Sequence, residues 1–158
     1  ILSVRENMSL ANLPSYCNKL KFVQTAREER EVDKMVERMN VKLSTPAQPI
    51  GSLSGGNQQK AILGKWLLTK PNVLILDEPT RGIDVGAKYE IYSLIAKLAA
   101  EGMAVILISS ELPEMMGMAD RVITFCEGRI TAEFTSNEIE QERIVNAAFG
   151  FQNAEELS

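Results

Sequence analysis

Histidine is absent from this chain of 158 residues, and cysteine occurs only twice. Without histidine the chain has no imidazole to shuttle protons near neutral pH. Cys17 and Cys126 show neither the spacing of a metal site nor that of a disulfide framework, so we expect buried or free thiols in a reducing cytosol. No apolar run approaches the roughly 20 residues that a membrane-spanning helix needs.

A loop that cradles phosphates is also missing. Such a loop needs the pattern Gly-x-x-x-x-Gly-Lys-Ser/Thr, but here Gly64-Lys65 is followed by Trp66 in an expected helix. The net charge of −4 gives no sign of a surface for nucleic acid or anionic lipid. The hydrophobic content of 45% and charged content of 24% are ordinary for a globular protein of one domain or less.

An apolar run ends in two adjacent carboxylates. Residues 73–76, Val-Leu-Ile-Leu, are followed by Asp77 and Glu78 and then by Pro79-Thr80. The run predicts a strand buried on both faces of a parallel sheet, with the acids at the edge where such sheets bind ligands. Asp77 suits Mg²⁺, and Glu78 would orient or deprotonate a water that attacks a phosphate. A strand followed by a solvated turn would give the same acidic pair by itself.

A pair of glycines precedes this strand at the start of an expected helix, in the string Leu53-Ser54-Gly55-Gly56-Asn57-Gln58-Gln59. Ser54 is a good N-cap. The glycines let backbone N–H groups approach a ligand, and the positive end of the helix makes the turn a candidate anion site. An ordinary capped helix after a loop would show the same composition.

A third acid follows the strand in the string Gly82-Ile83-Asp84-Val85-Gly86. Asp84 opens the next expected helix, where an acid near the N-terminus is favoured for electrostatic reasons alone. Taken together, the three parts in this order resemble the signature motif, Walker B strand and D-loop of an ABC-transporter ATPase. The combination is far more specific than any one of its parts.

The resemblance implies that the signature closes over the γ-phosphate of ATP held by an opposing domain, and that the D-loop links the two sites. It implies nucleotide-binding roles for five residues, Ser54, Gly55, Gly56, Gln58 and Asp84. It also implies that Asp77 holds Mg²⁺ and that Glu78 is catalytic. The string DEPTRGIDVGAK, residues 77–88, is similar to the second ATPase domain of bacterial importers for simple sugars such as ribose, galactose and xylose.

One position departs from the family pattern. Ser110 stands where ABC ATPases usually place a histidine that contacts the γ-phosphate. A serine hydroxyl can donate a hydrogen bond, but it cannot carry the charge of an imidazolium. Ser110 would also serve to cap a helix over residues 113–118, so chemistry at this domain's own site is in question.

We expect the chain to be a fragment, since residues 1–7 resemble the family segment after the glutamine loop and the P-loop would precede them. The intact protein would hydrolyse MgATP to drive monosaccharide uptake, while this fragment alone would be inactive. Its partners would be a first nucleotide-binding domain of the same polypeptide, transmembrane permease subunits and, indirectly, a sugar-binding protein, but no nucleic acid. It would lie at the cytoplasmic face of the bacterial cell membrane. The alternative is a non-catalytic ABC-like regulatory or interaction module.

The expected fold class is α/β. It is a partial P-loop NTPase domain of the ABC ATPase type, with a mostly parallel sheet flanked by helices and a helical subdomain, but without the P-loop portion. We predict a helical portion over 1–52, an α/β core over 53–134, and a C-terminal helix with a frayed tail over 135–158.

Periodicity predicts the individual elements. The expected helices are 26–39, 56–69 and 86–101, and the expected strands are 73–76, 104–109 and 121–126. Glu127-Gly128-Arg129 is expected to form a hairpin turn from the last of these strands into a strand that ends near Phe134. Ile62, Leu63, Trp66 and Leu67 are expected to form an apolar stripe on the second helix. Thr135 and Glu138 form a capping box that predicts a final helix to about Phe149.

Overall fold

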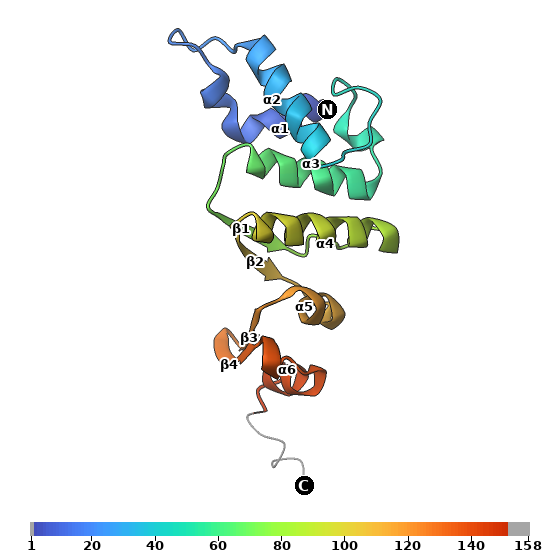
Figure 1. Ribbon diagram of the computed structural model, residues 1–158, viewed down its shortest axis with the longest axis vertical. Helices are drawn as coiled ribbons and strands as arrows, with labels where there is room; N and C mark the ends of the chain where they lie inside the picture. The colour runs from blue at the N-terminus through green and yellow to red at the C-terminus, as the bar shows by residue number, and fades with distance from the viewer. Residues whose placement is uncertain (1, 152–158) are drawn as a thin grey trace. The chain divides into compact units, whose positions relative to one another are not determined.

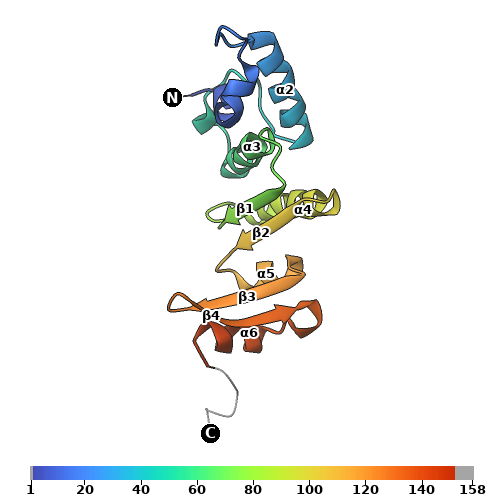
Figure 2. The same cartoon turned by 90° about the vertical axis from the view of Figure 1, so that its left-hand side faces the viewer.

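The computed structural model describes residues 2–151. Contacts between these residues divide the chain into two compact units, one ending at Ile106 and one beginning at Leu107. Figures 1 and 2 show the order of the elements along the chain. Within the described part, no helix is long and apolar enough to cross a membrane.

Three helices form one layer of the first unit: α1 (Val4–Ser9), α2 (Thr25–Arg38) and α3 (Gly55–Leu67). Short 3₁₀ helices at Leu10–Tyr16 and Ile50–Ser52 connect them. Helix α1 packs against both α2 and α3 (Figure 1). Their shared core is apolar and contains Val4, Met8, Val32, Met35, Met39, Leu63 and Leu67, all at most 8% exposed.

The buried face of α3 differs from the predicted apolar stripe. Leu63 and Leu67 are buried as expected, but Ile62 and Trp66 are 47% and 48% exposed. Instead, Lys60 is 2% exposed. At 100° per residue, positions 62 and 66 fall on the side of the helix opposite position 60. Because α3 packs against α1 on one flank and α4 on another, its buried arc centres on residue 60 rather than on the largest apolar side chains.

A βαβ unit follows, as predicted from the alternation of strand and helix patterns. Strand β1 (Val73–Asp77) and strand β2 (Ala104–Ile108) are neighbours in one two-stranded sheet and run parallel (Figure 2). Helix α4 (Val85–Ala100) connects them and also packs against α3. The first unit therefore confirms an α/β fold with a small parallel sheet.

The prediction that β1 is buried on both faces is wrong. Leu74 and Leu76 are 4% and 7% exposed, whereas Val73 and Ile75 are 51% and 64% exposed. Successive side chains of a strand point to opposite faces of its sheet. Within the described residues, packing covers only one of those faces, so the continuous apolar run is half exposed.

The second unit contains helix α5 (Leu112–Met118), strands β3 (Arg121–Cys126) and β4 (Arg129–Thr135), and helix α6 (Gln141–Ala148). The two strands form an antiparallel hairpin. The predicted turn is confirmed, since Glu127 and Gly128 both have positive φ, 48° and 76°, as a tight hairpin turn of type I′ requires. Its core is formed by Val122, Phe134, Ile144 and Ala147.

The capping box is present, but it does not begin the final helix. Thr135 and Glu138 cap only the short 3₁₀ helix Ser136–Glu138. Ile139 then takes an extended backbone and packs against the core of the second unit. This apolar contact interrupts the helix, so α6 starts only at Gln141.

Candidate functional site

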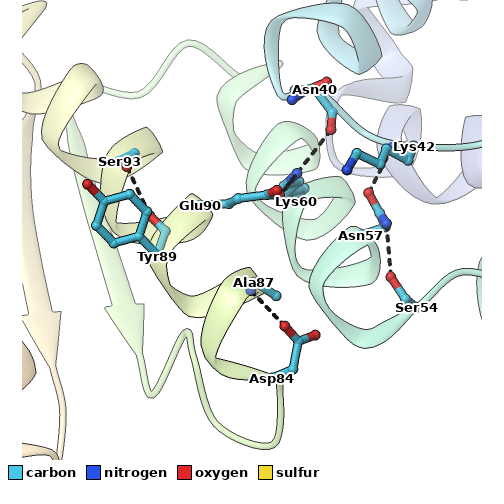
Figure 3. Close-up of polar contacts among 10 residues, drawn as sticks. All are labelled: Asn40, Lys42, Ser54, Asn57, Lys60, Asp84, Ala87, Tyr89, Glu90 and Ser93. Atoms are coloured by element: carbon cyan, nitrogen blue, oxygen red, sulfur yellow. Dashed lines mark hydrogen bonds and ion pairs between the residues drawn. The ribbon is translucent and has the colours of Figure 1, made fainter.

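The first turns of α3 and α4 line one shallow depression of about 260 Å³ in the first unit. Figure 3 shows how side chains from both helices and from the segment after α2 meet there. Three of the predicted site residues contribute to it, Ser54, Gly56 and Asp84. The other lining residues are Lys42, Asn57, Gly86, Ala87 and Glu90.

Gly56 explains how two helix starts come so close together. A Cβ atom built on Gly56 would lie 2.5 Å from the Cβ of Ala87, far inside van der Waals contact. Only a residue without a side chain therefore fits at this crossing. Gly55 is less restricted, because its Cβ would lie 3.2 Å from a methyl group of Ile83.

The α3 helix begins without a side-chain cap. Ser54 occupies the N-cap position, as predicted, but its hydroxyl forms no hydrogen bond to the first turn of the helix. Instead, Asn57 donates its side-chain amide to Ser54 Oγ at 2.9 Å, and Asn57 Oδ1 accepts the backbone N–H of Lys42 at 2.8 Å (Figure 3). The first-turn amides of α3 thus stay available to an anion.

The α4 helix begins differently. Asp84 Oδ1 accepts the backbone N–H of Ala87 at 2.9 Å, which is an ordinary N-cap hydrogen bond. The predicted start of a helix at Asp84 is confirmed. Of the two helix ends at the depression, α4 is therefore satisfied by its own carboxylate, and α3 is the end that can receive a negatively charged ligand.

Lys60 lies behind the depression and was missed by sequence reasoning. Its Nζ donates to Glu90 Oε2 at 2.5 Å and to the backbone carbonyl of Asn40 at 3.0 Å (Figure 3). The hydrogen bond from Lys60, together with the charges of Lys60 and Lys42, holds the pKa of the Glu90 carboxyl below its usual value. A signal did exist in the sequence, since Lys60 follows Gly56 by four residues and so shares its face of the helix.

The remaining predicted residues lie outside this depression. Gln58 is turned back, with its side-chain amide donating to the carbonyl of Leu53 at 2.8 Å. Asp77 is exposed at the end of β1, and Glu78 follows with a left-handed φ of 46°. For a residue other than glycine this conformation is uncommon and fixes the direction in which the side chain leaves the strand. Ser110 is exposed after β2, in the second unit.

Asp77 has the donor chemistry that Mg²⁺ accepts. No group of three or more potential ligands gathers anywhere among residues 2–151, so this part of the chain offers no closed metal cage. Mg²⁺ is usually held by one or two carboxylates together with substrate phosphates and water. A single exposed carboxylate at the end of a strand fits that mode of binding.

The chain is similar in sequence to known importer subunits. The model of the ABC transporter family matches residues 1–81. A ribose import ATP-binding protein of Clostridium perfringens is 50% identical over 152 residues, which is 96% of this chain and 30% of the relative. A xylose import ATP-binding protein of Pseudomonas fluorescens is 52% identical over 147 residues, 93% of this chain and 28% of the relative. The chain thus spans less than a third of the length of these curated relatives.

Solved structures agree on the fold. An ATP-binding cassette of an ABC transporter, MJ1267, has a TM-score of 0.77 at 22% identity, covering 94% of this chain and 63% of that one. CbiO1 from Clostridium perfringens, part of an ABC transporter complex, has a TM-score of 0.71 at 26% identity, covering 91% of this chain and 55% of that one.

Proposed function

The chain belongs to the ABC transporter family, and we propose that it is part of the ATP-binding subunit of an importer that couples ATP hydrolysis to monosaccharide uptake. The relatives named as ribose and xylose import proteins, at 50% and 52% identity, support a pentose as the substrate class. They also disfavour the alternative of a non-catalytic module.

The observation that carries this proposal is the depression at the starts of α3 and α4. There the α3 amides have no side-chain cap, and Gly56 brings the two helices into direct contact. On this proposal, Ser54 and Gly56 face the γ-phosphate of an ATP molecule held by an opposing domain. Gly55 and Gln58 would set the backbone conformation of the turn that begins α3. Asp84 would connect this turn to the segment that follows β1.

Hydrolysis would use the acids at the end of β1. Asp77 would hold Mg²⁺, which neutralises phosphate charge when bound. Glu78, whose backbone has a left-handed conformation, would orient or deprotonate the attacking water. Ser110 would supply a hydrogen-bond donor where the family pattern has a histidine, without the positive charge of an imidazolium.

The same proposal assigns partners and location. The opposing domain would be a first nucleotide-binding domain of the same polypeptide, and the helices within residues 10–52 would contact permease subunits. The core over 53–134 would carry the nucleotide site, and the region over 135–158 would supply the C-terminal helix, while the predicted frayed tail falls largely on residues 152–158, outside the described part of the chain. The subunit would be peripheral at the cytoplasmic face of a bacterial cell membrane, and a sugar-binding protein would act through the permease. This chain alone would be inactive, because half of each ATP site would lie on other segments.

A charge placed at the α3 turn tests the nucleotide role. We propose Ser54→Asp in the full-length protein assembled with its permease, because aspartate is as good an N-cap as serine and should preserve the helix. The matched control is Ser44→Asp, which is also an exposed position and undergoes the same change of charge, but does not line the depression. Steady-state ATPase activity and uptake of labelled ribose and xylose are the measurements.

Ser54→Asp should raise the apparent KM for MgATP about tenfold or more, because a carboxylate would face phosphate charges at close range. Ser44→Asp should remain near the unsubstituted protein. Equal behaviour of the two variants would contradict a phosphate-facing role for the α3 turn. If the unsubstituted protein hydrolyses ATP normally but takes up neither ribose nor xylose, the proposal of an ATP site stands and the proposal of a pentose substrate is rejected.

A further inference from the structure

Lys60 is an almost fully buried cation beside a site proposed to bind an anion. Its side chain is 3% exposed, whereas the Glu90 side chain, which receives its hydrogen bond, is 46% exposed and lines the depression. A buried ammonium is stable only when it is paired and hydrogen-bonded. Lys60 satisfies this condition through Glu90 and the Asn40 carbonyl.

The charges around the depression depend on this one lysine. Of the side chains that line it, Lys42 is positive, while Asp84 and Glu90 are negative. Taken alone, the lining carries one net negative charge and would repel phosphate. When Lys60, which lies behind Glu90, is included, the sum of the formal charges is zero.

We propose that Lys60 is a positioning residue that neutralises Glu90 and so keeps the depression receptive to the phosphates of a nucleotide. This inference rests on the proposed function, because it assumes that the depression faces ATP. Lys60 itself lies behind Glu90 and acts through that carboxylate rather than by direct contact with the phosphates.

Lys60 also forms a mechanical link. It lies one turn beyond Gly56 on α3, and Glu90 lies three residues beyond Ala87 on α4. The ion pair therefore reinforces the helix crossing next to the Gly56–Ala87 contact. Asn40, which supplies the carbonyl, follows α2 with a left-handed φ of 49°, so a third element is joined to the same ammonium. A purely structural tether is the competing explanation.

A double-mutant cycle on the full-length protein distinguishes neutralisation of Glu90 by Lys60 from a purely structural role of the ion pair. We propose Lys60→Met, Glu90→Gln and the double variant, with apparent KM for MgATP, kcat and melting temperature measured for each. Lys60→Met leaves Glu90 uncompensated and should raise KM about fivefold, an effect that should shrink at high salt. The double variant lacks both the charge and the tether, yet its KM should return to within about twofold of the unsubstituted protein.

Glu90→Gln alone provides a test that does not require the loss of Lys60. An amide can still accept the lysine hydrogen bond, so the fold should be kept, and the depression gains one net positive charge. KM should therefore fall by about twofold to threefold. An unchanged KM for Glu90→Gln, or an equal KM defect in Lys60→Met and the double variant, would overturn neutralisation and leave only a tether.

The Ser54→Asp variant separates this inference from the proposed function. Suppose that Ser54→Asp raises KM, but KM does not rise in Lys60→Met, fall in Glu90→Gln and return in the double variant. The inference about Lys60 then fails, while the proposed function stands. If Ser54→Asp and all three variants leave KM unchanged, the depression does not face ATP and both proposals are rejected.

Discussion

Replacing Gly56 by alanine perturbs one defined contact between α3 and α4. The added Cβ would lie 2.5 Å from the Cβ of Ala87. Two carbon atoms in favourable contact are about 3.5–4.0 Å apart. The helices must therefore separate by about 1 Å at this crossing, or one of them must tilt, and the adjacent Lys60–Glu90 ion pair must lengthen with them.

The loss of stability expected for Gly56→Ala follows from the usual free-energy cost of overpacking a protein core. Inserting a methyl group where there is no space destabilises a protein by about 1–3 kcal/mol. Alanine regains part of this, because it is a better helix former than glycine by up to about 1 kcal/mol. We expect a net local destabilisation of about 1–2 kcal/mol, which corresponds to an opening equilibrium about 5–30 times larger.

Hydrogen exchange read by mass spectrometry measures this local opening in the full-length protein. Amides of α3 and α4 should exchange faster by that factor in Gly56→Ala. Amides of the β3–β4 hairpin, which belongs to the second unit, should be unaffected. The matched control is Gly55→Ala, whose Cβ would lie 3.2 Å from the end of a flexible isoleucine side chain that can yield.

A compensating variant makes the test specific. Ala87→Gly removes the atom that the new methyl group would meet, so the combination Gly56→Ala/Ala87→Gly should be more stable than the sum of the two single changes. If the two single effects simply add, or if Gly56→Ala exchanges no faster than Gly55→Ala, then the close crossing of α3 and α4 is not what selects glycine at position 56.

Two further predictions concern the same region. Asp84→Ala should cost about 1 kcal/mol of stability because it removes a real N-cap bond, whereas Ser54→Ala should cost less than about 0.5 kcal/mol, which denaturant unfolding would show. Equal costs would contradict the uncapped start of α3. The pKa of Glu90 is lowered by Lys60, so its stabilising effect is present above the unfolded value near 4.5 and is lost as pH falls through the lowered folded value. The stability difference between the unsubstituted protein and Glu90→Gln should therefore be fully present above about pH 4.5 and decline as the pH falls below it, and a difference that does not decline with falling pH would refute the charge pair.

Local sequence signals identified most of the elements and the family. Runs of apolar residues predicted β1, β2 and β3 to within one residue at their ends, and the Glu127-Gly128 turn was correct. The ABC ATPase prediction is confirmed by the family match. These features depend on residues close together in the chain, where periodicity and turn chemistry are direct consequences of residue type.

The errors arose where a distant segment decides the outcome. An apolar run predicts a strand, but it does not state whether both faces of its sheet are covered, and Ile75 is exposed. A capping box predicts a helix start, but the packing of Ile139 against the core moved the start of α6 to Gln141. In both cases packing between segments decided the outcome: it is missing on one face of β1, and it is present at Ile139.

The sequence by itself determined the site motifs, the order of strand and helix, and the family to which the chain belongs. Only the tertiary structure placed Gly56 against Ala87, left the first turn of α3 uncapped, and buried Lys60 between Glu90 and the Asn40 carbonyl. The reason is physical: a lysine in a helix is ordinarily a solvated side chain, and it becomes a buried counter-charge only because two segments, 20 residues before it and 30 residues after it, meet at the same point.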